Sequence, residues 1–222
     1  MAAFWTLLGL AGIAALADWW AVANDDHRLE YVAKPLVLAA LVAAVALMPA
    51  SNVVDPARRW WFLAALACCL AGDVLLMLPR DLFVPGLASF LAGHVLFVVG
   101  FLDPGAPQVR SAAGIAIAAA VVVAAGAYPV YRIVRAIAAA GDRLLIGPVM
   151  VYVAAIATMA AIAWNVSRPL AAAGATAFLV SDTLLATDRF VRPLRQGTLV
   201  VHATYHVAQV LLVLSLVGTH AG

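Results

Sequence analysis

The sequence predicts an all-α integral membrane protein built as a bundle of about eight transmembrane helices. Of its 222 residues, 66% are hydrophobic and only 11% are charged, whereas soluble domains have about 45–50% apolar and about 25% charged residues. The mean hydropathy is +1.05. The apolar residues also gather in runs of about 17–25, the length that crosses a bilayer as a helix. A soluble fold is excluded because too little polar sequence remains to cover its surface.

Eight such runs follow one another, each ended by a polar break or by a break that contains Pro or Gly. The fifth is the least regular, because Pro129 follows it and Arg132 and Arg135 lie just beyond. The stretch 130–140 either extends the fifth helix or forms a short helix at the membrane interface. We treat residues 1–222 as one membrane domain. The expected spans lie near residues 3–22, 32–49, 59–78, 83–102, 111–128, 144–164, 169–187 and 198–218.

The basic residues predict the orientation of these spans, since cytoplasmic loops are enriched in Lys and Arg. An even number of spans puts both termini on one side. The breaks after the odd-numbered spans hold nine basic residues, namely Arg28, Lys34 at its helix edge, Arg80, Arg132, Arg135, Arg143, Arg189, Arg192 and Arg195. The opposite side holds Arg58, Arg59, Arg110 and Arg168. We therefore expect a bacterial inner-membrane protein with both termini outside. Its net charge of +2 is too small to indicate a nucleic-acid partner, and nothing in the sequence indicates an oligomeric state.

Several polar side chains lie inside the predicted spans, where an ionisable group costs about 2.5–3.5 kcal/mol on insertion scales. Such groups are kept mainly where they face each other or a wet cavity. Nearly all of them fall in the cytoplasmic half of the bundle, and independent structural residues would have no reason to share a depth. This clustering predicts one intramembrane active site in that half. Its members are Lys34, Asp73, His94, Tyr152, Ser181, Asp182, His202, Tyr205, His206 and Gln209.

Each of these residues also has a structural interpretation. Lys34 opens the second span and can snorkel to the headgroups, while His94 can bridge two helices. Asp73 or Asp182 can pair with an arginine. Asp18 has no assigned role, because it precedes the tryptophans of the first span and a wet loop and fits an interfacial residue. The tryptophans at the span ends are expected to form an aromatic belt; they are Trp5, Trp19, Trp20, Trp60 and Trp61.

A short internal repeat contains the two aspartates. The segment GDVLL at 72–76 is matched by SDTLL at 181–185, which is 109 positions later, and the same offset pairs Lys34 with Arg143. Two four-helix halves in parallel orientation would produce this pattern. Similarity elsewhere between the halves is faint.

The spacing of His202 and His206 leaves a metal-dependent alternative open. The two residues are four apart and share a helix face, as zinc ligands often do. With Asp73, Asp182 and His94 they would form a zinc site in an intramembrane lipid amidase or esterase. The spacing alone is weak, so we assign no metal and no cofactor. No GxSxG, phosphate loop or HExxH motif is present.

A small proton-coupled transporter is a second alternative, because internal repeats and membrane-embedded carboxylates also occur in transporters. Transporters usually carry helices interrupted by Gly or Pro at matching positions of the two halves. Pro148 near the start of the sixth span has no counterpart at position 39. This mismatch disfavours the transporter.

Six short motifs resemble the YhhN/lysoplasmalogenase family in order and in position within the spans. They are KPL at 34–36, GD at 72–73, FLAGH at 90–94, the span around Tyr152, GATAFLVSD at 174–182 and YHVAQ at 205–209. The resemblance implies an eight-span membrane hydrolase that cleaves the vinyl ether of lysoplasmalogens, with a lysophospholipid as substrate. It also implies that Asp73 and Asp182 are the catalytic pair.

The chemistry of a vinyl ether agrees with two carboxyl groups. Protonation of the β-carbon gives an oxocarbenium ion, and water then adds to form a hemiacetal that collapses to an aldehyde and an alcohol. This sequence requires one acid and one base, as in glycoside hydrolysis. We expect one of Asp73 and Asp182 to hold a proton and the other to activate water. His94 and His206 would orient them, and Tyr152 would line the pocket.

Overall fold

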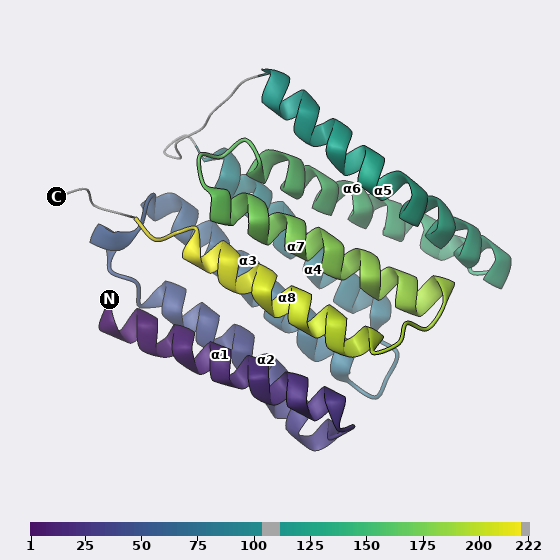
Figure 1. Cartoon of the computed structure of the whole chain (residues 1–222), viewed down its shortest axis with the longest axis horizontal. Coiled ribbons are helices and arrows are strands. Elements are labelled where there is room, and N and C mark those ends of the chain that lie inside the picture. Colours follow the sequence, from purple (N-terminus) through teal and green to yellow (C-terminus); the bar gives the residue numbers. More distant parts are fainter. Residues whose placement is uncertain (104–111, 219–222) are drawn as a thin grey trace.

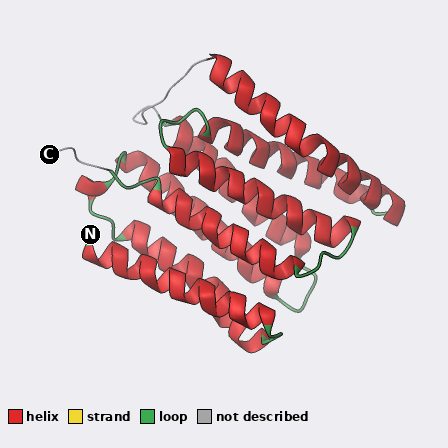
Figure 2. Cartoon of the chain, in the orientation of Figure 1, coloured by secondary structure: helices red, strands yellow, loops and turns green. Residues whose placement is uncertain are grey.

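The computed structural model describes residues 1–103 and 112–218. In that part of the chain, long helices lie along a common direction and alternate in sense (Figure 1). The described residues are helices and connecting loops, with no strand among them (Figure 2). This confirms the predicted fold class. The long helices are α1 (Ala2–Ala23), α2 (His27–Ala46), α3 (Pro56–Met77), α4 (Phe83–Leu102), α5 (Ala112–Ala140), α6 (Ile146–Ala163), α7 (Pro169–Ala186) and α8 (Gly197–Leu214).

Seven helices of the described residues are long and apolar enough to cross a membrane, so the chain is a multi-pass membrane protein. They are α1 to α4, α6 together with the turn at Arg143–Leu145 before it, α7 together with the turn at Thr187–Val191 after it, and α8. The fifth predicted span corresponds to α5, which runs through Pro129 to Ala140 without interruption. The stretch 130–140 is therefore an extension of that helix. Residue 111, where the span was expected to begin, lies outside the described residues.

The helices other than α5 form a closed ring. Neighbouring pairs are α1 with α2, α2 with α3, α3 with α4, α4 with α6, α6 with α7, α7 with α8, and α8 with α1. Helix α5 packs on α6 and on the π-helical turn η3 (Thr187–Val191) that follows α7. In Figure 1, α1 and α2 lie at one side of the bundle and α5 at the other. The start of α1 and the end of α8 lie at the same end of the bundle.

Helix α2 begins five residues earlier than expected, at His27, because Asp26 caps it. The Asp26 carboxylate accepts a hydrogen bond from the Leu29 backbone N–H at 3.2 Å. Lys34 therefore lies two turns inside the helix and is only 8% exposed. The expectation that Lys34 opens the span is wrong, and so is the interpretation that it snorkels to the headgroups.

Two helix pairs approach closely where a glycine faces the partner helix. A Cβ at Gly93 of α4 would lie 2.9 Å from Cys69 Sγ and 3.2 Å from the Ala65 carbonyl oxygen of α3. A Cβ at Gly174 of α7 would lie 3.0 Å from the Ala208 carbonyl oxygen of α8. Small residues permit such contacts between helices in lipid, where dispersion forces replace the hydrophobic drive. The α3–α4 and α7–α8 pairs thus form two tight hairpins.

The contacts between helices match the expected two four-helix halves only in part, because α1 belongs to the ring and its counterpart α5 does not. Helices α3 and α7 carry the matched aspartates and each forms one of the tight hairpins. Helix α2 packs on α3 as α6 packs on α7. The second helix of each hairpin also packs against the other half, since α4 contacts α6 and α8 contacts α2. The aspartate of each half therefore faces residues from both halves.

Candidate active site

A cavity of about 840 Å³ lies between the helices and holds most of the predicted site. It reaches from the helix ends at Tyr31 and Met77 inward to Phe90 and Ile156. The lining is largely apolar and includes one side of α5 around Pro129. Seven of the ten predicted residues line the cavity: Lys34, Asp73, Tyr152, Ser181, Asp182, His202 and Tyr205. A large apolar pocket with a few converging polar groups is the usual form of a small-molecule site.

Asp73 comes from α3 and is 1% exposed. Its Oδ2 accepts a hydrogen bond of 2.8 Å from the Tyr205 hydroxyl of α8. Its Oδ1 lies 3.6 Å from Lys34 Nζ of α2, which is an ion-pair distance but longer than an ordinary hydrogen bond. The first carboxylate is therefore held by one hydroxyl and faces one cation.

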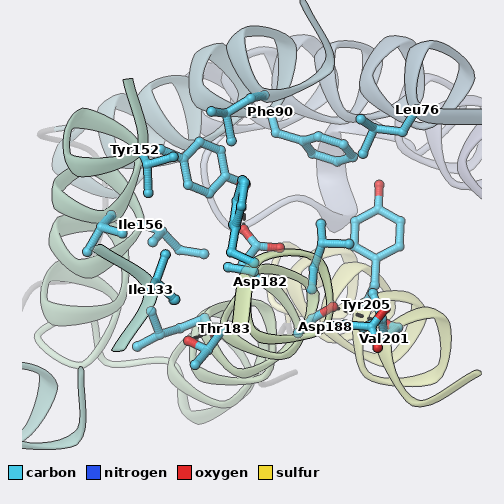
Figure 3. A pocket seen from close by; sticks show the side chains of 18 of the residues that line it. Leu76, Phe90, Ile133, Tyr152, Ile156, Asp182, Thr183, Asp188, Val201 and Tyr205 are labelled. Carbon is cyan, nitrogen blue, oxygen red and sulfur yellow. Dashed lines mark hydrogen bonds between the residues drawn. The ribbon is translucent and has the colours of Figure 1, made fainter. Parts of the chain in front are cut away.

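Asp182 comes from α7 and has a different set of partners. Its Oδ2 accepts a short hydrogen bond from the Tyr152 hydroxyl of α6. His94 Nε2 of α4 lies 3.2 Å from the same oxygen and 3.0 Å from the Tyr152 hydroxyl. Figure 3 shows the Asp182 side chain near the centre of the view, with Tyr152 on one side and Tyr205 on the other. Within the described part of the chain, Oδ1 makes no hydrogen bond, and the side chain is 13% exposed.

Asp18 was not assigned to the site from the sequence, yet it is fully buried. Its Oδ2 lies 2.8 Å from His202 Nδ1, and His202 Nε2 lies 3.1 Å from Lys34 Nζ. The interpretation of Asp18 as an interfacial residue is wrong, because α1 packs against α8 and turns this carboxylate inward. In the sequence, the tryptophans next to Asp18 indicate an interfacial position and give no sign that it is buried.

Three of the predicted residues, His94, His206 and Gln209, lie behind the cavity wall. His94 does not line the cavity but contacts Asp182 from behind. His206 accepts a hydrogen bond of 3.1 Å at Nδ1 from Trp19 Nε1. Trp19 therefore faces inward, and the expectation that it belongs to the aromatic belt is wrong. Gln209 is fully buried in α8 away from the lining. Ser181 lines the cavity and donates to the Val201 carbonyl oxygen at 3.0 Å.

The donor arrangement gives the zinc alternative no support. Among the residues that the structure describes, no group of three or more His, Cys, Asp or Glu side chains is placed to hold a metal ion. His202 Nδ1 and His206 Nδ1 lie 2.8 Å and 3.9 Å from Asp18 Oδ2, but His202 Nε2 contacts Lys34 and His206 Nδ1 accepts a hydrogen bond from Trp19. His94 and Asp182 form a separate pair, so these side chains do not converge.

The open end of the cavity lies where the loops after α1, α3, α5 and α7 gather. The Tyr31 hydroxyl donates a hydrogen bond of 2.6 Å to the Met77 carbonyl oxygen and joins α2 to the end of α3. Arg189 lies over the Phe83 ring at 4.1 Å and bonds Asp81 at 3.1 Å, which connects the loop after α7 to the loop after α3. Five further arginines are exposed at this end: Arg28, Arg80, Arg143, Arg192 and Arg195.

Comparison with known proteins identifies relatives of the chain. A model of the YhhN family matches residues 29–216. The chain is 34% identical over 158 residues to lysoplasmalogenase TMEM86B of Sus scrofa, covering 68% of this chain and 61% of that protein. It is 28% identical over 222 residues to a lysoplasmalogenase of Mycobacterium bovis, covering 96% of this chain and 83% of that protein. The chain thus spans less than two thirds of the mammalian relative, and no solved structure matches significantly. The match over most of its length shows that the chain belongs to the YhhN family.

Proposed function

We propose that the protein is a lysoplasmalogenase, which hydrolyses the vinyl ether bond of a lysoplasmalogen to a fatty aldehyde and a glycerophospho-alcohol. The observation that carries the proposal is a largely apolar cavity into which two carboxyl groups, Asp73 and Asp182, project from different helices. The relatives that are lysoplasmalogenases by name support the same reaction. A soluble substrate would not need an apolar cavity of this size inside a membrane protein.

The cavity suits a single-chain amphiphile. The alkenyl chain would lie along the apolar wall that α5 and α6 supply, with Ile133 and Ile156 among its contacts. The phosphate would remain at the open end, where exposed arginines such as Arg80 and Arg192 gather. This placement leaves the vinyl ether, which joins the chain to the glycerol, near the polar residues of the wall.

The partners of the two carboxyl groups support different roles for them. Asp182 receives a hydrogen bond from Tyr152 and the contact of His94 on the same oxygen. With its proton on Nε2, His94 donates as well, and two donors favour the carboxylate form. Its other oxygen is free among the described residues and can take a proton from water. We assign Asp182 as the base.

Asp73 is then the acid. It transfers its proton to the β-carbon of the vinyl ether, and the double bond supplies the electron pair, which leaves an oxocarbenium ion at the α-carbon. Water adds to that carbon and gives its proton to Asp182, forming a hemiacetal. As the carbon–oxygen bond to the glycerol breaks, Asp182 gives its proton to the leaving glycerol oxygen and the hemiacetal hydroxyl gives its proton to Asp73, so that the alcohol and the aldehyde form and both carboxyl groups are restored. One water molecule is consumed.

The orientation of the protein supports access from the cytoplasmic side. The open end of the cavity coincides with the loops that hold most basic residues, and Lys and Arg favour the cytoplasm. Because Lys34 lies inside α2, it no longer counts among the basic residues of the cytoplasmic loops. The remaining basic residues still favour the same side. We infer an inner-membrane enzyme with its termini outside and its substrate entering from the cytoplasmic leaflet.

A lysolipid panel tests this function. Purified full-length protein is incubated with vinyl-ether, alkyl-ether and ester lysolipids of matched chain length, and released aldehyde, alcohol and fatty acid are measured. We expect aldehyde from the vinyl-ether lipid alone. The double variant Asp73→Asn/Asp182→Asn, checked for folding, serves as the control for contaminating activity. Fatty acid from the ester lipid without any aldehyde would contradict the proposal.

A further inference from the structure

A buried chain of polar contacts connects Asp18 to the proposed acid. Asp18 of α1 contacts His202 of α8 at 2.8 Å, and His202 contacts Lys34 of α2 at 3.1 Å. Lys34 in turn lies 3.6 Å from Asp73 of α3. All four side chains are at most 10% exposed. Side chains from four helices therefore meet along one buried path.

The direction of the hydrogen bonds fixes the form of His202. The Lys34 ammonium has donors and no acceptor, so His202 Nε2 must accept from it. A neutral imidazole that accepts at one nitrogen carries its proton on the other, and Nδ1 therefore donates to Asp18. The other oxygen of Asp18, Oδ1, has no hydrogen-bond partner among the described residues. His202 is thus the contact that anchors the Asp18 carboxylate.

The charges along this path of polar side chains do not balance if Lys34 and both aspartates ionise. Lys34 carries one positive charge, while Asp18 and Asp73 together would carry two negative charges. Buried charges are tolerated mainly when they are paired. The hydrogen-bonded path from Lys34 runs through neutral His202 to Asp18, whereas its distance to Asp73 exceeds a hydrogen bond. One of the two carboxyl groups must then be neutral, and because the proposed mechanism places the proton on Asp73, Asp18 is left as the carboxylate that offsets the charge of Lys34.

We propose that Asp18 is a positioning residue that holds Lys34 through His202 and carries its counter-charge, so that Asp73 remains able to hold the proton it transfers to the substrate. This inference rests on the proposed function, because it assigns a role to Asp18 in that reaction. It also explains how an aspartate that faces a lysine can serve as an acid. Neither the sequence motifs nor the family resemblance point to Asp18.

The test combines kinetics with a matched control. We expect Asp18→Asn to lower kcat for the vinyl-ether substrate by about tenfold or more, as loss of acid catalysis requires, with KM changed by less than about twofold. Asp25→Asn makes the same chemical change on an exposed loop residue and should leave kcat unaltered. Because Asp18 acts through His202, the double variant Asp18→Asn/His202→Gln should be no slower than His202→Gln alone. Losses that multiply in a folded double variant, or full kcat in Asp18→Asn, would overturn the proposal.

A second measurement does not depend on activity or on the stability of a variant. Nitrogen-15 spectra of histidine-labelled wild-type protein report which ring nitrogen carries the proton, and His202→Gln identifies the His202 signals. We expect His202 to be neutral with its proton on Nδ1. A proton on Nε2, or on both nitrogens, would refute the proposed path. If the wild type releases no aldehyde, the proposed function fails, while this spectrum still decides whether the Asp18–His202–Lys34 path exists.

Discussion

The two catalytic candidates, Asp73 and Asp182, lie in the matching motifs GDVLL and SDTLL but have different neighbours. Each lies on the first helix of a tight hairpin and faces a side chain from the other half. Asp73 meets Lys34 and Tyr205, whereas Asp182 meets Tyr152 and His94. We propose that the scaffold supplies two similar carboxyl groups and that the residues around them determine which is the acid and which the base.

The largest expected effect separates these roles by single substitution. Asp73→Asn removes the proton donor and should lower kcat by about 10²–10⁴. Asp182→Asn should retain measurable activity, with a loss on the order of tenfold, because water can add to an oxocarbenium ion without a strong base. Aldehyde release by the two purified variants under saturating substrate checks the order. A greater loss in Asp182→Asn would reverse the assigned roles.

The neighbouring tyrosines offer a smaller and more selective effect. Each donates one hydrogen bond to its carboxylate, so Tyr152→Phe and Tyr205→Phe should each cost about tenfold or less in kcat. In the Asp182→Asn background, Tyr152→Phe should add almost nothing, whereas Tyr205→Phe should keep its full effect. Kinetics of the two double variants measure this coupling. Equal additional losses would mean that the tyrosines do not serve separate carboxyl groups.

Sequence reasoning predicted the bundle, and seven of its ten candidate residues line one cavity, because membrane burial makes both apolar spans and embedded polar groups conspicuous. Apolar length alone gives the spans, and the cost of a charge in lipid singles out Asp73 and Asp182. Sequence reasoning could not predict which polar residues contact which aspartate. Those contacts depend on packing between distant segments, such as α1 against α8. Lys34 was misplaced by a helix start that an aspartate cap sets. Asp18 was overlooked because an inward and an interfacial aspartate look alike beside tryptophans.

The hairpins that carry the two carboxyl groups also differ in how firmly their glycines are constrained, which predicts the smallest effect. A Cβ at Gly174 would meet two backbone atoms at 3.0 Å, the Ala208 oxygen and the Leu212 nitrogen. A Cβ at Gly93 would meet the Cys69 side chain at 2.9 Å and one backbone atom, the Ala65 oxygen, at the longer distance of 3.2 Å. Overpacking costs about 1–3 kcal/mol, so both alanine variants should melt earlier in detergent, Gly174→Ala more than Gly93→Ala. Gly9 has open space around its Cβ position, so Gly9→Ala should instead stabilise α1 by up to about 1 kcal/mol. Thermal unfolding of the three variants at equal detergent concentration checks this order, and equal shifts at the first two positions would show that the hairpins adapt alike.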